Sequence, residues 1–273
     1  MRQVIFLIIW SGLSSIGTQA QISTSARLLG MGAVGAANRS YIGDMLGNPA
    51  AITSNHHPAL MAGHHYMYYQ PEVSSQLLSF VLPFQRVQMG LVAVHFGLES
   101  AYRFTSLGYL YGQLFGPYLS VAWAVHYRRF QIPNYREDQG VATDIGLHYI
   151  CRPGWTVGVA FRRLSLVPSV GDFQHTAPSE VRIGVMGHAG AGLKMALDLS
   201  YRKANEINLY GGLDYAFVPD LFFMRLGLST ENKLSPFAGL GLSWEKFRID
   251  AGSSFHAALG MSPQIDVSYV FQK

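Results

Sequence analysis

The sequence predicts an all-β protein that crosses a membrane as an antiparallel β-barrel of about fourteen strands. Three observations carry this prediction. Apolar and polar residues alternate through much of the last third of the chain, residues 193–271. The alternating runs are longer than the strands of most soluble proteins. The polar positions of these runs also carry full charges.

The alternation is clearest in residues 193–201, where the odd positions are apolar and the even positions are charged, small or hydroxylic. A period of two predicts a strand with one apolar and one polar face. A soluble β-sandwich shows the same pattern, so alternation alone leaves both folds open. Length favours the barrel, because the longest runs reach nine to eleven residues. A tilted strand needs about 9–11 residues to cross a bilayer.

The charged side chains on the polar faces of the last strands are assigned to the lumen. A sandwich core would not hold them, whereas a water-filled barrel interior would. These lumen-facing charges are Lys194, Asp198, Asp214, Arg225, Arg248, Asp250 and Asp266.

The composition agrees with a membrane barrel. Of 273 residues, 49% are hydrophobic and only 13% are charged, against about 25% charged in soluble domains. The mean hydropathy is +0.16, yet no run of 18 apolar residues follows the N-terminus. Barrels need no such run, because half of each strand faces the lumen. The net charge of +4 is mild and gives no reason to expect a nucleic-acid partner.

Residues 1–20 have the pattern of a secretory signal peptide. Arg2 supplies the positive start, residues 4–10 the apolar core, and Thr18-Gln19-Ala20 a small-x-small cleavage site. A membrane anchor helix is the alternative, but seven strongly apolar residues are too few to span a bilayer. We therefore expect a bacterial outer-membrane location after signal-peptide cleavage.

The sequence gives little support for an enzyme, and we expect no catalytic residue and no cofactor. The single cysteine, Cys151, excludes an internal disulfide and lies beside a predicted tight turn. The segment 253–256 places serines near His256, but the G-x-S-x-G motif of serine hydrolases is absent from the sequence.

Two histidine pairs, His56-His57 and His64-His65, are candidates for a metal site, because histidine is the commonest metal-binding side chain. Adjacent residues of a strand point to opposite faces, so each pair offers at most one inward imidazole. No Cys, Asp or Glu lies between the pairs. We interpret them as polar residues near the start of the barrel and expect no metal.

The segment before the strands, residues 25–54, is not strand-like and carries two recognisable motifs. Residues 26–32 read Ala-Arg-Leu-Leu-Gly-Met-Gly, and residues 48–50 read Asn-Pro-Ala. This segment resembles the N-terminal signature of the PorV/PorQ-like outer-membrane proteins, relatives of the FadL long-chain fatty acid transporters. That family carries an A-R-x-L-G-M-G-G-A opening followed by N-P-A-G-L. Ala33 and Ala51 depart from it, because glycine is usual at both positions.

The resemblance implies that residues 21–59 fold into the barrel as a hatch, with residues 60–273 forming the barrel. The hatch positions that it marks are Arg27, Gly30, Gly32, Asp44, Asn48, Pro49 and Ala50. The lumen charges would line a conducting pore, or they would pair with one another and with Arg27 or Asp44 and close the lumen. Because desolvated charges need partners, we favour the closed lumen.

Candidate strands number about fourteen, and the even number is usual for bacterial barrels. They are residues 60–69, 76–84, 87–96, 101–112, 118–130, 139–151, 154–164, 180–188, 192–202, 206–217, 220–229, 235–244, 247–254 and 263–271. The even-numbered connections are all short, and the three longest, residues 131–138, 165–179 and 255–262, are odd-numbered. Short turns are typical of the periplasmic side and longer loops of the outer side.

Two arginine pairs, Arg128-Arg129 and Arg162-Arg163, fall near strand ends that this topology places outside. Guanidinium groups bind phosphate in a bidentate manner. Contact with lipopolysaccharide phosphates is one interpretation, and interfacial snorkelling is the other.

Three functions remain open. The PorV/PorQ resemblance implies a non-enzymatic component or docking partner of a secretion or assembly machine, as in the type IX secretion system of Bacteroidota. Its partners would be outer-membrane lipid and other outer-membrane or secretion proteins. The alternative is a FadL-like channel for hydrophobic small molecules, which needs an apolar pocket beside the hatch and a lateral opening at kinked strands. A general porin ranks last, because a mature chain of about 250 residues leaves little for constriction loops.

Overall fold

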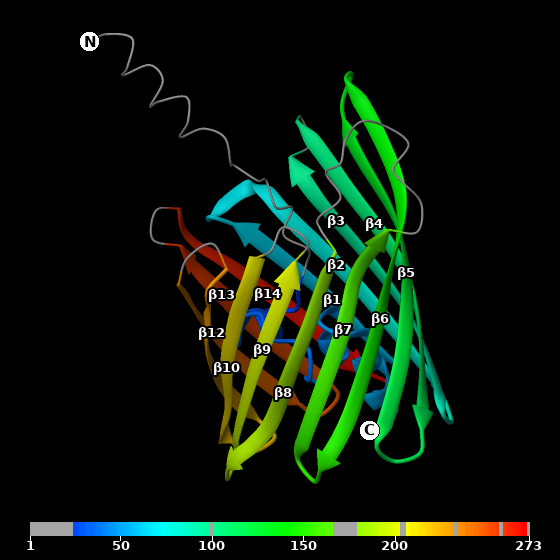
Figure 1. The fold of residues 1–273 in the computed structure, drawn as a ribbon. Coiled ribbons are helices and arrows are strands. Elements are labelled where there is room, and N and C mark those ends of the chain that lie inside the picture. The colour runs from blue at the N-terminus through cyan, green and yellow to red at the C-terminus, as the bar shows by residue number, and fades with distance from the viewer. Residues whose placement is uncertain are drawn as a thin grey trace, which may run out of the picture.

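Fourteen antiparallel strands close into a single barrel (Figure 1). The computed structural model describes residues 24–98, 101–165, 179–202, 206–231, 234–256 and 259–271, so the predicted signal peptide lies outside the described residues. Each strand pairs with its neighbours in the chain, and β14 returns to pair with β1, with Val270 opposite Ala59. The prediction of an antiparallel barrel of about fourteen strands is confirmed.

The strands vary in length around the barrel. Their bounds are β1 (Ala59–Met67), β2 (Gln70–Phe84), β3 (Val87–Leu98), β4 (Tyr102–Phe115), β5 (Leu119–Ile132), β6 (Arg136–Arg152), β7 (Trp155–Ser165), β8 (Glu180–Gly190), β9 (Leu193–Arg202), β10 (Glu206–Val218), β11 (Phe222–Ser229), β12 (Ser235–Trp244), β13 (Phe247–His256) and β14 (Gly260–Val270). The wall formed by β3 to β6 rises above the rest of the barrel in Figure 1.

One end of the barrel carries only tight turns, and we name it the turn end. Its six connections are residues 85–86, 116–118, 153–154, 191–192, 219–221 and 245–246. Each of them contains a residue with positive φ: Gln85, Gly116, Gly154, Gly192, Asp220 and Glu245. A residue with positive φ allows the chain to reverse direction within two or three residues. The opposite end, at the top of Figure 1, is named the loop end.

The alternation of the sequence places polar side chains inside and apolar side chains outside. On β9, Leu197 and Leu199 are about half exposed on the outer surface, whereas Asp198 and Ser200 are buried. Outward-facing leucine, valine, tyrosine and phenylalanine continue this apolar belt on the other strands. An apolar exterior around a polar interior is the arrangement of a membrane barrel. No helix among the described residues is both long and apolar enough to cross a membrane.

Residues 24–58 form the hatch, which lies inside the barrel and consists of three short helices with connecting loops. They are α2 (Ala26–Gly30), the 3-10 helix η1 (Ile42–Leu46) and the 3-10 helix η2 (Pro49–Ser54). The side chain of Ser25 caps α2 by accepting a hydrogen bond from the backbone N–H of Leu28. Asn48 caps η2 in the same way, and Pro49 follows at its first position.

The strand bounds differ from the prediction at the loop end. The predicted first strand, residues 60–69, ends at Met67 because Tyr68 and Tyr69 both have positive φ and form the turn. The predicted loop 131–138 is wrong, because the β5–β6 ladder continues to the pair Ile132 and Arg136. Where a strand extends beyond the bilayer, its residues are polar on both faces, yet their backbones still form the hydrogen bonds of the ladder. The end of the alternation in the sequence therefore does not mark the end of these strands.

Candidate functional site: the hatch and the lumen

The hatch lies so close to the barrel wall that glycines are needed on both sides. A Cβ atom on Gly30 of α2 would lie 2.8 Å from the Cα of Gly239 on β12. A Cβ on Gly212 of β10 would lie 2.3 Å from the carbonyl oxygen of Met31. Glycine permits such an approach between two backbones because it has no side chain. Close packing against the hatch therefore accounts for glycine at Gly212 and Gly239.

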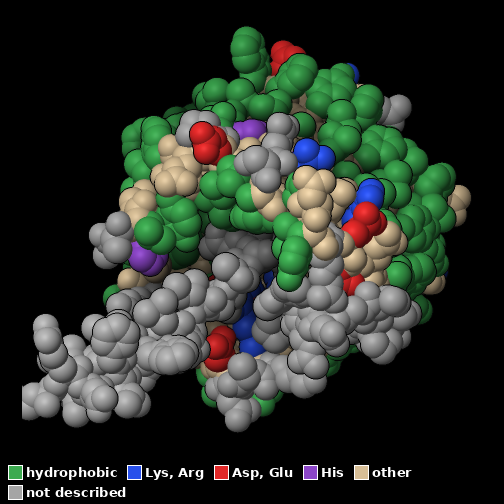
Figure 2. Space-filling model, turned by 90° about the horizontal axis from the view of Figure 1, so that it is seen from above, with side chains coloured by type: hydrophobic (Ala, Val, Ile, Leu, Met, Phe, Trp, Pro, Cys, Tyr) green, Lys and Arg blue, Asp and Glu red, His purple; other side chains and the backbone are tan. Residues whose placement is uncertain are grey.

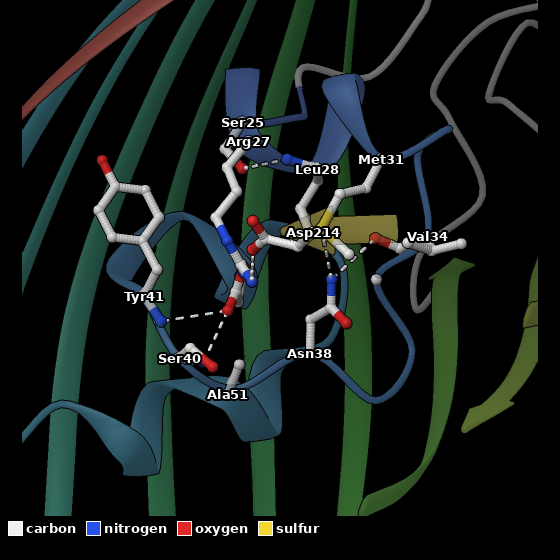
Figure 3. A network of polar contacts seen from close by, with 12 residues as sticks. Ser25, Arg27, Leu28, Met31, Val34, Asn38, Ser40, Tyr41, Ala51 and Asp214 are labelled. Atoms are coloured by element: carbon white, nitrogen blue, oxygen red, sulfur yellow. Dashed lines mark hydrogen bonds and ion pairs between the residues drawn. The ribbon is translucent and has the colours of Figure 1, made fainter. Parts of the chain in front are cut away.

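Arg27 joins the hatch to the barrel through buried ion pairs. Its guanidinium donates to Asp44 within the hatch and to Asp214 on β10, the latter at 2.9 Å. Arg27 and Asp214 lie beside each other beneath α2 in Figure 3. Burial alone would lower the pKa of Arg27, but the charges of Asp44 and Asp214 outweigh it and raise the pKa above its ordinary value. The guanidinium therefore stays charged inside the lumen.

The barrel charges around Arg27 continue this network. Arg225 pairs with Asp214 at 3.3 Å and with Asp250 at 2.8 Å, and Arg248 pairs with Asp250 at 2.8 Å. Cations and carboxylates thus alternate from β10 through β11 to β13. Such pairing compensates the loss of water from each charge.

Asp44 also shapes the hatch itself. Its carboxylate accepts hydrogen bonds from the backbone N–H groups of Ser40 at 2.7 Å and Tyr41 at 3.1 Å. Figure 3 shows these bonds below the Arg27 guanidinium. The ring of Tyr41 lies under the guanidinium of Arg248, 4.8 Å from the ring centroid. Lys194 reaches the Ser40 hydroxyl at 3.5 Å, so it too faces the hatch.

Two further barrel carboxylates bind hatch backbone. Asp266 on β14 accepts from the N–H of Ala26 at 2.6 Å, at the start of α2. Asp198 on β9 accepts from the N–H groups of Gly35 and Ala36 at 2.7 and 2.9 Å. Charge-assisted bonds of this kind are among the stronger hydrogen bonds in proteins. Each of the predicted lumen-facing charges therefore lies in the interior, in contact with the hatch or with another charge.

The Asn-Pro-Ala motif fastens the second half of the hatch. The Asn48 amide donates to the carbonyl oxygens of Ala36 at 2.6 Å, Leu147 on β6 at 3.2 Å and Val159 on β7 at 3.2 Å. Its own Oδ1 accepts from the N–H of Ala50 at 3.0 Å. Asn48 thus bridges two barrel strands and two parts of the hatch.

The side of the hatch that faces β1 to β5 is apolar. Ile42, Met45 and Ile52 pack among the inward side chains of the barrel wall. Those wall residues include Met61, Leu77, Val81, Val92, Leu110, Ala122 and Ala124. The hatch is therefore amphipathic within the lumen: ion pairs hold it on the β9 to β14 side, and apolar packing holds it on the opposite side.

The arginine pairs do not lie as the sequence suggested. Arg162 and Arg163 turn inward and pair with Glu180 on β8, at 3.8 and 2.8 Å. Their side chains are only 11% and 7% exposed, so they present no surface to lipopolysaccharide. Arg162 lies on the inward face of β7 with Thr156 and Ala160. Arg163 is turned inward by a bulge, in which it adopts positive φ and its N–H donates to Asp144 on β6.

Arg128 also faces inward, since it shares the face of β5 that carries the buried Ala122 and Ala124. Its neighbour Arg129 faces outward and forms an exposed pair with Glu137 on β6 at 2.8 Å. Contact with lipopolysaccharide thus stays a prediction for Arg129 alone.

A charged cluster at the loop end of β7 to β10 went unnoticed in the sequence. Arg182 on β8 pairs with Glu180 at 2.8 Å, and Arg202 on β9 pairs with Glu231 at 2.6 Å. The alternation of the sequence predicts that these side chains point inward. It does not predict that they lie close to one another. Seen from the loop end, the barrel mouth is hollowed, and basic and acidic side chains are visible within it (Figure 2).

The histidine pairs lie at opposite ends of β1. His56 and His57 line a shallow pocket of about 220 Å³ at the turn end, with Ser54, Asn55, Ala59 and Val270. His65 is buried against the lumen near the loop end. Within the described ranges no cluster of three or more His, Cys, Asp or Glu side chains is arranged to hold a metal ion.

Taken together, the described residues define a closed barrel of fourteen strands whose lumen is filled in its middle by an N-terminal hatch. Solved structures share this fold. The CymD monoaromatic hydrocarbon channel aligns with a TM-score of 0.72 at 14% identity, over 93% of this chain and 99% of that chain. The toluene transporter TodX of P. putida gives a TM-score of 0.70 at 12% identity, over 92% and 99%.

A FadL homologue of Pseudomonas aeruginosa gives a TM-score of 0.67 at 12% identity, over 91% of this chain and 98% of that chain. No protein-family model matches the sequence, and no curated protein matches it. Identities this low establish a common fold.

Proposed function

We propose that this protein is an outer-membrane barrel that admits small hydrophobic molecules, in the manner of the FadL-type channels. The observation that carries the proposal is the architecture, a closed barrel of fourteen strands around an N-terminal hatch. It is shared over nearly the whole chain with proteins described as a monoaromatic hydrocarbon channel and a toluene transporter. Of the predicted functions, these similarities favour the hydrophobic channel over a secretion component.

In this proposal the turn end faces the periplasm and the loop end faces outward, after removal of the signal peptide. The tight turns and the apolar belt support that orientation and location. Molecules enter at the loop-end hollow, above the hatch (Figure 2). We propose no catalytic role and no cofactor for the barrel.

The direct test is accumulation of radiolabelled toluene by cells whose own hydrophobic channels have been deleted. Expression of the barrel should raise the initial rate several-fold over cells that express a polar porin at the same level. The polar porin controls for a leakier outer membrane. Equal rates in the two strains would exclude the hydrophobic channel.

A second candidate, a docking component of a secretion or assembly machine of the PorV/PorQ type, is favoured by one observation. The middle of the lumen is packed and carries buried ion pairs, such as those of Arg27 with Asp44 and Asp214. A barrel closed in this way would act through its surfaces. Purification from the native outer membrane in mild detergent tests it: stoichiometric recovery of other outer-membrane proteins supports docking, and recovery of the barrel alone excludes it.

A further inference from the structure

The inward face of β3, β4 and β5 carries an aromatic cluster near the loop end, named here the aromatic wall: Phe96, Tyr102, Phe104 and Phe130. Phe96 lies opposite Phe104 in the β3–β4 register, and Phe104 lies opposite Phe130 in the β4–β5 register. The ring centroids of Phe96 and Tyr102 are 5.7 Å apart, and those of Tyr102 and Phe130 are 6.2 Å apart and stacked. Phe96 is buried, and the other three rings are partly exposed. Stacked rings of this kind form a surface against which a further aromatic ring packs.

Arg128 adjoins the aromatic wall on the same face of β5, two residues from Phe130. No described residue forms a hydrogen bond or ion pair with its guanidinium; only longer-range interactions with Asp144 and Arg162 are found. Asp144 is already engaged by the N–H of Arg163 at 2.6 Å and by His126 at 3.4 Å. A half-buried guanidinium without a carboxylate partner favours an anion supplied from outside.

The other arginines of this region each form an ion pair, whereas Arg128 forms none with a described residue. Arg162, Arg163 and Arg182 share Glu180. Arg202 pairs with Glu231. Arg128 thus differs from these arginines in having no ion pair. Asp138, which lies opposite Phe130 on β6, is the carboxylate on the same inward face, and its Oδ1 is buried and forms no hydrogen bond with a described residue.

The lumen beside Arg128 has room for a ligand. Gly140 lies directly opposite Arg128 on β6, and a Cβ atom built on it would meet no atom of a described residue within 4 Å. Further down the same face of β6, a Cβ on Gly146 would lie 2.0 Å from Oδ1 of Asn48. The hatch therefore fills the lumen at Gly146 and leaves it open at Gly140. Ser106, opposite Arg128 on β4, presents a hydroxyl to the same space.

We propose that Arg128 and the aromatic wall bind a small aromatic anion, a single ring that bears one carboxylate or sulfonate. This inference rests on the proposed function and narrows its substrate class. Residues two apart on a strand are about 7 Å apart, which matches a ring with its acidic group attached directly. The guanidinium binds the acid in a bidentate manner, and the rings of Phe130 and Tyr102 contact the substrate ring. A long acyl chain fits less well, because the inward face below Arg128 carries the polar His126 and Asp144.

The test compares 4-methylbenzoate with p-xylene, its neutral analogue of nearly the same shape. Their binding to the purified full-length barrel is measured by titration calorimetry at neutral pH and fixed ionic strength. The Arg128→Gln variant should weaken 4-methylbenzoate binding about tenfold or more and change p-xylene binding less than about twofold. The matched control is Arg129→Gln, because Arg129 is the adjacent arginine and faces outward. Heat-dependent gel mobility establishes that both variants are folded.

Equal effects of Arg128→Gln and Arg129→Gln on 4-methylbenzoate, or no binding of it by the unaltered protein, would overturn the site. Displacement of 4-methylbenzoate by dodecanoate at far lower concentration would overturn the assignment to a single ring. If toluene is still admitted in the cell assay, these results leave the proposed channel function standing. If toluene is not admitted either, the channel function itself fails.

Discussion

Arg27 shows how a single residue couples the hatch to the barrel. Its guanidinium is completely buried and contacts a carboxylate from each part, Asp44 and Asp214. Removal of one partner from a buried ion pair leaves the other charge uncompensated, which is much costlier than replacing the whole pair. The residue therefore matters through the charges that it neutralises.

Replacement of Arg27 by methionine should lower the free energy of unfolding by about 3–5 kcal/mol, because Asp44 would be left buried without a cation and Asp214 would keep only Arg225. Urea titration of the barrel in lipid vesicles measures the change. Arg129→Met is the control, since Arg129 is exposed on the outer surface. A midpoint for Arg27→Met equal to that of the control would show that the ion pairs do not stabilise the fold.

Two inward-facing glycines provide a second prediction at the same scale. Gly212→Ala should destabilise the protein by about 1–3 kcal/mol, because the added methyl group would collide with the Met31 carbonyl oxygen. Gly140→Ala should change the free energy by less than about 0.5 kcal/mol, because its methyl group would meet no atom of the described residues within 4 Å. The same urea titration measures both variants. Equal costs would mean that the hatch is not packed against β10 as described.

At the scale of the element, β9 shows why the presence of a strand could be predicted from the sequence. Its odd residues are apolar and its even residues polar, and the structure turns the former outward and the latter inward. Neither feature needs knowledge of the partner strands, because a period of two is a property of one extended chain.

The depth of an outward-facing residue in the bilayer should determine the cost of placing a charge there, and β9 offers two positions to compare. Leu197→Arg should destabilise the barrel by about 2–4 kcal/mol, because Leu197 lies outward near the middle of β9. Tyr201→Arg, on the same face near the loop end, should cost about 0–1 kcal/mol. Folding titrations into vesicles of defined composition measure both. A larger cost at Tyr201 would place the membrane belt nearer the loop end.

Contacts between distant elements could not be predicted from the sequence. The position of Asp198 in the alternating pattern predicts that it faces the lumen. The neighbouring sequence does not show that it binds the N–H groups of Gly35 and Ala36. Likewise, Arg163 was expected at the surface and is turned inward by a bulge that depends on Asp144 of the neighbouring strand. Such contacts arise only when the closed barrel brings residues more than a hundred positions apart together, or inserts one extra residue into a ladder.

At the scale of the whole molecule, the hatch matches two different halves of the barrel interior. Ion pairs and carboxylate bonds hold it against β9 to β14, whereas Ile42, Met45 and Ile52 pack against β1 to β5. The resemblance in residues 25–54 predicted that this segment lies inside the barrel. It did not predict the division between charged and apolar faces, which follows from the arrangement of the strands around the hatch.

The hatch should also determine whether the lumen conducts ions. A chain in which residues 24–58 are replaced by a short glycine-serine linker should form a stable, large conductance in planar bilayers, because the remaining interior is lined by charges such as Asp214, Arg225 and Asp250. The full-length barrel should conduct far less.

Since the shortened chain would also lack the partners of these charges, an intact chain with both Arg27→Ala and Asn48→Ala provides a second variant. It keeps the hatch but removes its bonds to Asp214, Leu147 and Val159, and it should show frequent openings. If both variants fold and neither conducts more than the unaltered barrel, the wall itself closes the lumen and the hatch does not.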